Sequence, residues 1–98
     1  MSYQSKLQSE EMDHLFEAIL SLENTEDCYR FFEDVCTINE IKALAQRWQV
    51  AVLLSEGKTY TEVKEITEAS PATISRINKC LLYGADGYTS VIERLKNK

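Results

Sequence analysis

The sequence predicts an all-α chain of six helices, and three observations support this prediction. Apolar residues recur at helical spacing almost throughout, whereas strict alternation over the length of a strand is absent. Two S/T-x-x-E capping boxes and one Ser-Pro pair supply helix starts. The 98 residues include one proline and three glycines, so we expect a single domain, 1–98, with few interruptions.

The first half of the chain predicts three helices. The first runs from about Ser9 to Leu22, and the second, capped by Asn24 or Thr25, ends near Asp34. A capping box of Thr37 and Glu40 opens the longest helix, which ends near Gly57. The first two helices should bury apolar faces formed by Met12, Leu15, Phe16, Ile19, Leu20, Leu22, Cys28, Phe31, Phe32 and Val35.

The longest helix is apolar around most of its circumference. Its apolar residues are Ile41, Leu44, Ala45, Trp48, Val50, Ala51, Val52, Leu53 and Leu54. Such a helix must be covered on two sides, and a chain of this length has little left to do so. We therefore expect a homodimer with a shared core, in which residues 9–57 form the dimerisation helices and residues 1–8 are flexible.

The second half predicts three further helices. Thr59 and Glu62 start a short helix that ends near Thr67, and Ser70 with Pro71 starts another that ends near Leu82. A loop at 84–87 then precedes a C-terminal helix within 88–98, which we expect to direct Val91, Ile92 and Leu95 inward.

Two short helices joined by three residues are the sequence form of a helix-turn-helix, here residues 58–83. The inward positions of such a pair are Val63, Thr67, Ala69, Ile74 and Ile77. Glu68 lies where the turn usually has a glycine at positive φ, a conformation that costs another residue on the order of 1 kcal/mol.

The second helix of this unit has an outward face suited to DNA. That face consists of Ala72, Thr73, Ser75, Arg76 and Lys79. Hydroxyl groups bond phosphates or base edges, methyl groups meet thymine, and cations address guanine or phosphate. We also expect phosphate contacts from Lys58, from Lys64 and from free backbone N–H groups at the helix start.

The charge distribution permits DNA binding by an acidic protein. The formal charge is −5, but residues 1–40 hold ten acids and two bases, whereas residues 41–98 hold six acids and nine bases. The segment 58–83 has a net charge of only +1, a weak electrostatic signal. A helical protein-protein interaction module without DNA binding is therefore the alternative, and only DNA binding should weaken steeply with salt.

Other functional classes have little support. His14 is the single histidine, and no phosphate loop, HExxH or nucleophile-elbow pattern occurs, so we expect no enzyme and no metal site. Cys28, Cys36 and Cys80 match no zinc-ligand spacing and are expected to be free, mostly buried thiols in a reducing cytoplasm. No apolar run is long enough to cross a membrane.

From about Phe16 to Leu95 the chain resembles the Trp repressor superfamily, specifically its tryptophan-repressor-related proteins. Four stretches carry the resemblance: TINEI at 37–41, LAQRW at 44–48, LSEGKTYTEV at 54–63 and SPATISR at 70–76. The resemblance implies an intertwined all-helical homodimer that presents two helix-turn-helix units to successive major grooves, as a transcriptional repressor on a near-palindromic operator.

The resemblance also implies where a small effector would bind. Arg47 and Arg76 match two arginines that sandwich the indole of the corepressor, and Thr37 matches a residue that helps to hold its ammonium group. However, Ile77 replaces a glycine beside the indole, and Cys80 replaces a serine that contacts the amino acid. These changes argue against L-tryptophan and leave an unknown effector or none. Alternatively, the two arginines pair with acids such as Glu40 or Glu56, or are simply exposed.

Overall fold

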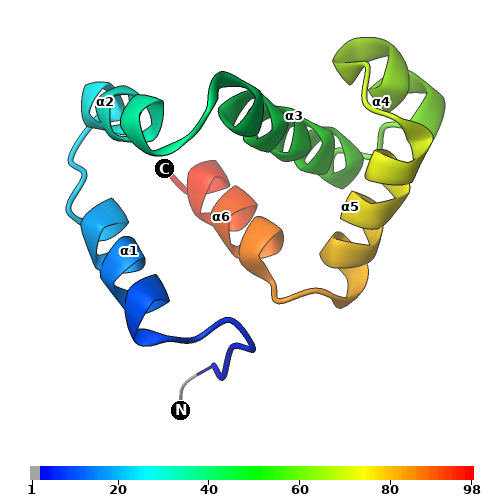
Figure 1. Cartoon of the computed structure of the whole chain (residues 1–98). Helices are drawn as coiled ribbons and strands as arrows, with labels where there is room; N and C mark the ends of the chain where they lie inside the picture. Colours follow the sequence, from blue (N-terminus) through cyan, green and yellow to red (C-terminus); the bar gives the residue numbers. More distant parts are fainter. Residues whose placement is uncertain (1–2) are drawn as a thin grey trace. The chain divides into compact units, whose positions relative to one another are not determined.

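The computed structural model describes residues 3–98 and has six α-helices and no strand in that range (Figure 1). The helices are α1 (Glu10–Leu20), α2 (Thr25–Val35), α3 (Ile38–Ser55), α4 (Tyr60–Thr67), α5 (Pro71–Tyr83) and α6 (Gly87–Lys96). The predicted all-α class is confirmed, and every predicted helix is present with its ends within two residues of expectation.

The chain forms two compact units, Met1–Thr37 and Ile38–Lys98. In the first unit, local caps set the helix starts: Ser9 Oγ accepts from the Met12 N–H at 3.1 Å, and Asn24 Oδ1 accepts from the Asp27 N–H at 2.8 Å. Residues 1 and 2 of the segment that we expected to be flexible lie outside the described residues. Residues 3–8 form no helix, and Ser5 Oγ accepts from the Leu7 N–H at 3.0 Å.

Neither helix of the N-terminal unit has a buried residue. Phe16 is 50% exposed, Leu20 83% and Val35 53%, although each was expected to face a core. The rings of Phe31 and Phe32 meet edge to face with their centroids 5.2 Å apart, but both remain half-buried. The predicted burial of these faces is therefore wrong for the single chain, because two helices of 11 residues each form no second layer that could cover them.

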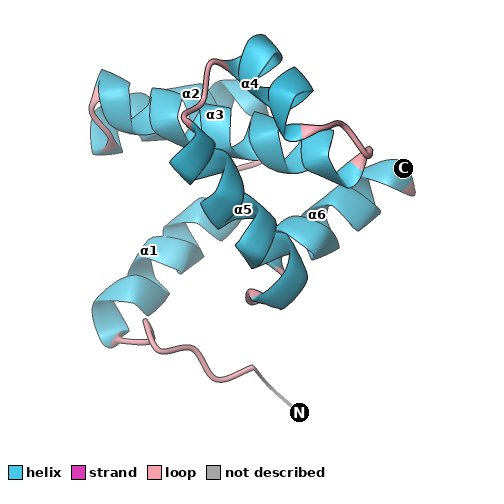
Figure 2. Cartoon of the chain, turned by 90° about the vertical axis from the view of Figure 1, so that its right-hand side faces the viewer, coloured by secondary structure: helices cyan, strands magenta, loops and turns pink. Residues whose placement is uncertain are grey.

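The C-terminal unit contains the hydrophobic core, which lies where α3, α4 and α5 meet. The fully buried residues there are Val50, Ala51, Val63, Ala69, Ile74 and Ile77. Four of the five predicted inward positions of the helix-turn-helix belong to this set, and Thr67 is half-buried. The predicted packing of α4 against α5 is confirmed. Both helices also contact α3, and α5 contacts α6 (Figure 2).

Several apolar side chains of the C-terminal unit remain exposed or only half-buried. Only Val50 and Ala51 of α3 are buried, while Leu44 is 45% exposed. Trp48 is half-buried and stacks on Tyr88, with ring centroids 6.3 Å apart and an interplanar angle of 28°. On α6, Ile92 is buried as expected. Val91 and Leu95 are 42% and 50% exposed, so their predicted inward placement is wrong for the single chain.

The three cysteines are free, as expected, but their predicted burial is wrong. Cys28 on α2 and Cys80 on α5 are exposed, and Cys36, which follows the end of α2, is half-buried. Across residues 3–98, no helix has both the length and the apolar character needed to span a bilayer.

Candidate nucleic-acid interface

The helix-turn-helix begins with a complete capping box at α4. The Thr59 N–H donates to Glu62 Oε1 at 2.8 Å, and the Glu62 N–H donates to Thr59 Oγ1 at 3.2 Å. The hydrogen bond from the Thr59 backbone N–H to the carboxylate is the main cause that holds the pKa of Glu62 below its usual value, with further contributions from the Thr59 side chain and from the charge of Lys58. Glu62 is thereby tied back to its own helix end.

The turn between α4 and α5 has the backbone that the sequence predicts. Glu68 adopts the left-handed conformation, with φ 61° and ψ 15°, and its N–H donates to the Lys64 carbonyl at 2.8 Å. The Thr67 hydroxyl donates to the Val63 carbonyl at 2.8 Å and accepts from the Ala69 N–H at 3.1 Å. Thr67 therefore fastens the last turn of α4 to the connection.

A contact from outside the motif holds this connection in place. The side-chain Nε2 of Gln46, on α3, donates to the backbone carbonyl of Thr67 at 3.1 Å. Sequence reasoning did not identify Gln46 as a positioning residue. The only available signal was a polar residue among the apolar positions of α3, and that pattern does not reveal its partner.

The start of α5 differs from expectation in one respect that matters for phosphate binding. Pro71 has no N–H, the Thr73 N–H donates to Ser70 Oγ at 3.1 Å, and the Ile74 N–H donates to the Ser70 carbonyl at 3.0 Å. Among the first four residues of α5, only Ala72 keeps an amide hydrogen with no recorded acceptor. The prediction of several free N–H groups here is therefore wrong, because the Ser-Pro start that sets the helix also occupies its donors.

Most of the predicted DNA-contacting side chains are accessible. Ala72, Arg76 and Lys79 are exposed and share one face of α5, since they are separated by four and three residues. Ser75 and Thr73 are half-buried at the two sides of this face, and the hydroxyl groups of Thr73 and Ser70 are hydrogen-bonded at 3.0 Å. Lys58, in the loop before α4, and Lys64, on α4, are also exposed.

The cations of this surface are unpaired. Within residues 3–98 the one recorded ion pair joins Arg30 to Glu26 at 2.9 Å, in the N-terminal unit. No ion pair is recorded for Arg47 or Arg76 in that range. Glu65 and Glu68 are exposed on the same motif, and they would repel phosphate if they faced the DNA backbone.

The five predicted effector residues are not brought together within one unit. Thr37 ends the N-terminal unit, whereas Arg47, Arg76, Ile77 and Cys80 belong to the C-terminal unit. Ile77 is 1% exposed and packs in the core, Arg47 is half-buried and Arg76 is exposed. A hollow of about 510 Å³ has an apolar lining of Trp48, Cys80, Ala85, Gly87, Tyr88 and Val91, so Cys80 alone of the five contributes to it.

Comparison with known proteins places the helix-turn-helix in a known family. A family model described as Trp repressor protein matches residues 10–96. The uncharacterised protein YerC of Bacillus subtilis (strain 168) is 55% identical over 91 residues, which are 93% of this chain and 88% of that protein.

Solved structures show the same fold. A crystal structure of a TrpR-like protein from Eubacterium eligens ATCC 27750 is 55% identical, with a TM-score of 0.90 over 93% of this chain and 94% of that one. A presumed Trp repressor from Staphylococcus aureus is 47% identical, with a TM-score of 0.89 over 95% and 93% of the two chains. With this match over nearly its whole length, the chain belongs to the Trp repressor family, a family of DNA-binding regulators.

Proposed function

We propose that the protein is a transcriptional repressor that acts in the cytoplasm as a homodimer on a near-palindromic operator. The observation that carries this proposal is the face of α5 formed by Ala72, Arg76 and Lys79, which is exposed and has no ion-pair partner on a motif whose other side is fixed in the core. Small, methyl-bearing and cationic side chains of this kind suit a major groove better than an apolar protein partner.

The homodimer is supported by apolar surface that the single chain leaves open. The helices α1 and α2 of the N-terminal unit bury no residue, and Leu44, Val91 and Leu95 of the C-terminal unit are also exposed. A second copy supplies cover for both sets. Two recognition helices related by two-fold symmetry require half-sites roughly 34 to 36 Å apart, which is one turn of DNA.

We further propose that L-tryptophan is not the effector. Ile77, at the position where the resemblance implies a glycine beside the indole, is 1% exposed and packs against the core. A branched side chain there occupies space that an indole would need. The two recognition helices of the homodimer then keep a fixed distance from each other without L-tryptophan. This arrangement is compatible with another effector or with none.

The test is selection of the purified protein on a random-sequence duplex library, followed by titration of enriched sites at two salt concentrations with and without L-tryptophan. We expect a two-fold symmetric motif, tighter binding than to random DNA, a steep loss of affinity with salt and no effect of L-tryptophan. No enrichment, with binding at the level of random DNA, would favour the protein-interaction module.

A charge-matched pair of variants connects this test to the structure. Arg76→Ala should lower DNA affinity while leaving the melting temperature nearly unchanged, because the side chain is exposed. Arg94→Ala removes the same charge from the exposed surface of α6 and serves as the control. Equal losses in both variants would indicate a general charge effect and move recognition away from α5.

A further inference from the structure

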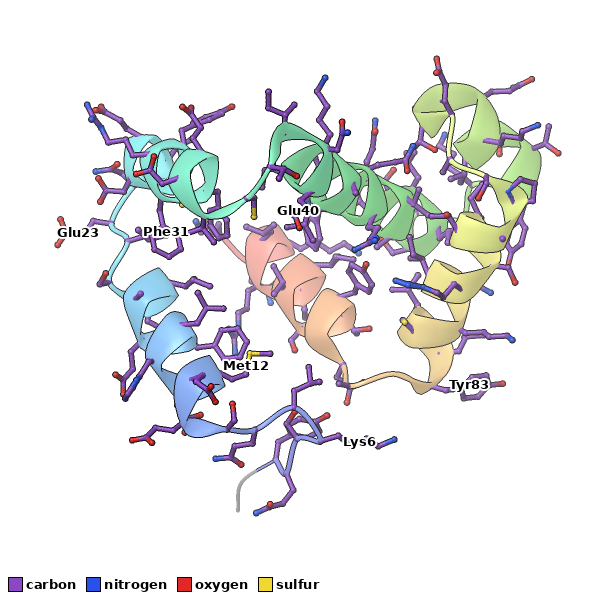
Figure 3. The ribbon with its side chains drawn as sticks, viewed as in Figure 1. Lys6, Met12, Glu23, Phe31, Glu40 and Tyr83 are labelled. Carbon is purple, nitrogen blue, oxygen red and sulfur yellow. The ribbon has the colours of Figure 1, made fainter. Side chains whose placement is uncertain are left out.

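Tyr83 is a large exposed side chain that the function proposed above does not yet use. It is the last residue of α5, 83% of its surface is exposed, and its ring extends away from the end of the helix (Figure 3). No hydrogen bond or ring contact is recorded for it among residues 3–98. A ring in this position contributes little to folding of the single chain.

The helical register places Tyr83 on the DNA-facing side of α5. It follows Ala72 by eleven residues, Arg76 by seven and Lys79 by four, so the four residues form one row along the helix. The buried residues Ile74 and Ile77 occupy the opposite side. Tyr83 therefore continues the exposed face that begins at Ala72.

The end of α5 is fixed directly after Tyr83. The Gly84 N–H donates to the Cys80 carbonyl at 2.9 Å, which closes the last turn. A Cβ at position 84 would lie 2.5 Å from that carbonyl oxygen, so this backbone path accepts only glycine. The position of Tyr83 at the helix end is thus determined by the backbone on both sides.

The length of the row decides what Tyr83 can reach. Eleven residues of α-helix span about 16 Å, which exceeds the roughly 12 Å width of the major groove. When the Ala72 end lies against base edges and the helix axis is inclined to the groove, the Tyr83 end comes to the sugar-phosphate backbone at the rim of the groove. A phenolic hydroxyl is one of the side-chain groups that bond phosphate oxygens.

The other end of α5 gives further reason for such a contact. Because Pro71 and Ser70 leave Ala72 as the one free amide of the first turn, the helix start provides a weaker phosphate anchor than an uncapped one. Phosphate contacts then depend more on side chains.

We propose that the Tyr83 hydroxyl donates a hydrogen bond to a backbone phosphate beside the groove that α5 enters. This inference rests on the proposed DNA binding and adds a contact to it. The donor is neutral, so it positions the helix without releasing a counterion, and it contributes equally on every sequence.

The test compares Tyr83→Phe with the wild-type protein on a selected site and on random duplex, at several salt concentrations. We expect about tenfold weaker binding to both DNAs, because one hydrogen bond to a charged group is lost. The slope of affinity against salt should stay unchanged, whereas Lys79→Ala should reduce it by about one unit for each engaged helix. The melting temperature and oligomeric state of Tyr83→Phe should equal those of wild type.

Tyr29→Phe provides the matched control, since Tyr29 is 67% exposed on α2. It should bind DNA as wild type does. Wild-type affinity of Tyr83→Phe on a DNA that the protein does bind would overturn the contact alone. A loss accompanied by a lower melting temperature or by dissociation would also overturn it. If the wild-type protein binds no DNA, the contact and the proposed function both fail.

Discussion

The side-chain amide of Gln46 donates to the backbone carbonyl of Thr67, 21 residues further along the chain, at 3.1 Å. The acceptor is at the last residue of α4, where helix carbonyls have no partner within the helix. One side chain of α3 thus forms a hydrogen bond with the end of α4, next to the turn of the helix-turn-helix.

We expect Gln46→Ala to destabilise the protein by about 1 kcal/mol, because a half-buried carbonyl loses its partner. Denaturant unfolding monitored by circular dichroism measures this cost. Gln49→Ala is the control, since Gln49 is an exposed glutamine of the same helix. Equal stability of the two variants would show that the Gln46 contact contributes nothing.

Replacement of Glu68 should separate backbone strain from charge. Glu68→Gly relieves the left-handed conformation and should stabilise the fold by about 0.5 to 1 kcal/mol, and it also removes a negative charge from the motif. Glu68→Gln removes the charge but keeps the strain. We therefore expect both variants to bind DNA more tightly and only Glu68→Gly to melt at a higher temperature. A rise in melting temperature for Glu68→Gln would contradict this division.

The capping box at α4 should make stability depend on pH in the acid range. The pKa of Glu62 is lowered by its hydrogen bonds to Thr59, so its contribution is present above the ordinary value of 4.5 and is lost as pH falls through the lowered value. Glu62→Gln keeps an acceptor for the Thr59 N–H but has no charge to titrate. The urea midpoint of wild type should exceed that of Glu62→Gln at pH 7, and the difference should shrink as the pH falls below 4.5. A difference that persists in acid would contradict the capping box as its cause.

Gly84 and Gly87 should respond differently to the same substitution. Gly84→Ala places a Cβ 2.5 Å from the Cys80 carbonyl oxygen, and the backbone must shift at a cost of roughly 1 to 3 kcal/mol. At Gly87 the added Cβ meets nothing within 4 Å, so Gly87→Ala should leave the melting temperature nearly unchanged. Thermal unfolding of both variants tests this difference, and equal melting temperatures would refute it.

Helix boundaries were predictable because their signals are local. Ser9, Asn24, Thr59 and Ser70 each accept a hydrogen bond from the N–H three residues ahead, and that spacing can be read from the sequence. The left-handed Glu68 was equally predictable, since a three-residue turn between two helices requires such a residue there.

The remaining features depend on tertiary structure. The bond from Gln46 to Thr67 exists only because α3 passes the end of α4, and the spacing of apolar residues does not encode it. The sequence predicted apolar faces on α1 and α2, but an apolar face does not reveal whether its cover comes from the same chain. For the candidate site, the exposed positions Ala72, Arg76 and Lys79 of α5 could be predicted. The loss of free backbone amides at the start of α5 became apparent only from the hydrogen bonds that Ser70 accepts in the structure.

Because α1 and α2 have no buried residue, a newly made chain exposes apolar surface in the cell. These helices are synthesised before α3–α6, and Phe16 and Leu20 leave the ribosome without a layer in α1 or α2 to cover them. Exposed apolar surface of this kind is what chaperones and proteases recognise. An unassembled chain should therefore be short-lived, and degradation should remove it whenever synthesis is too slow for chains to find a partner.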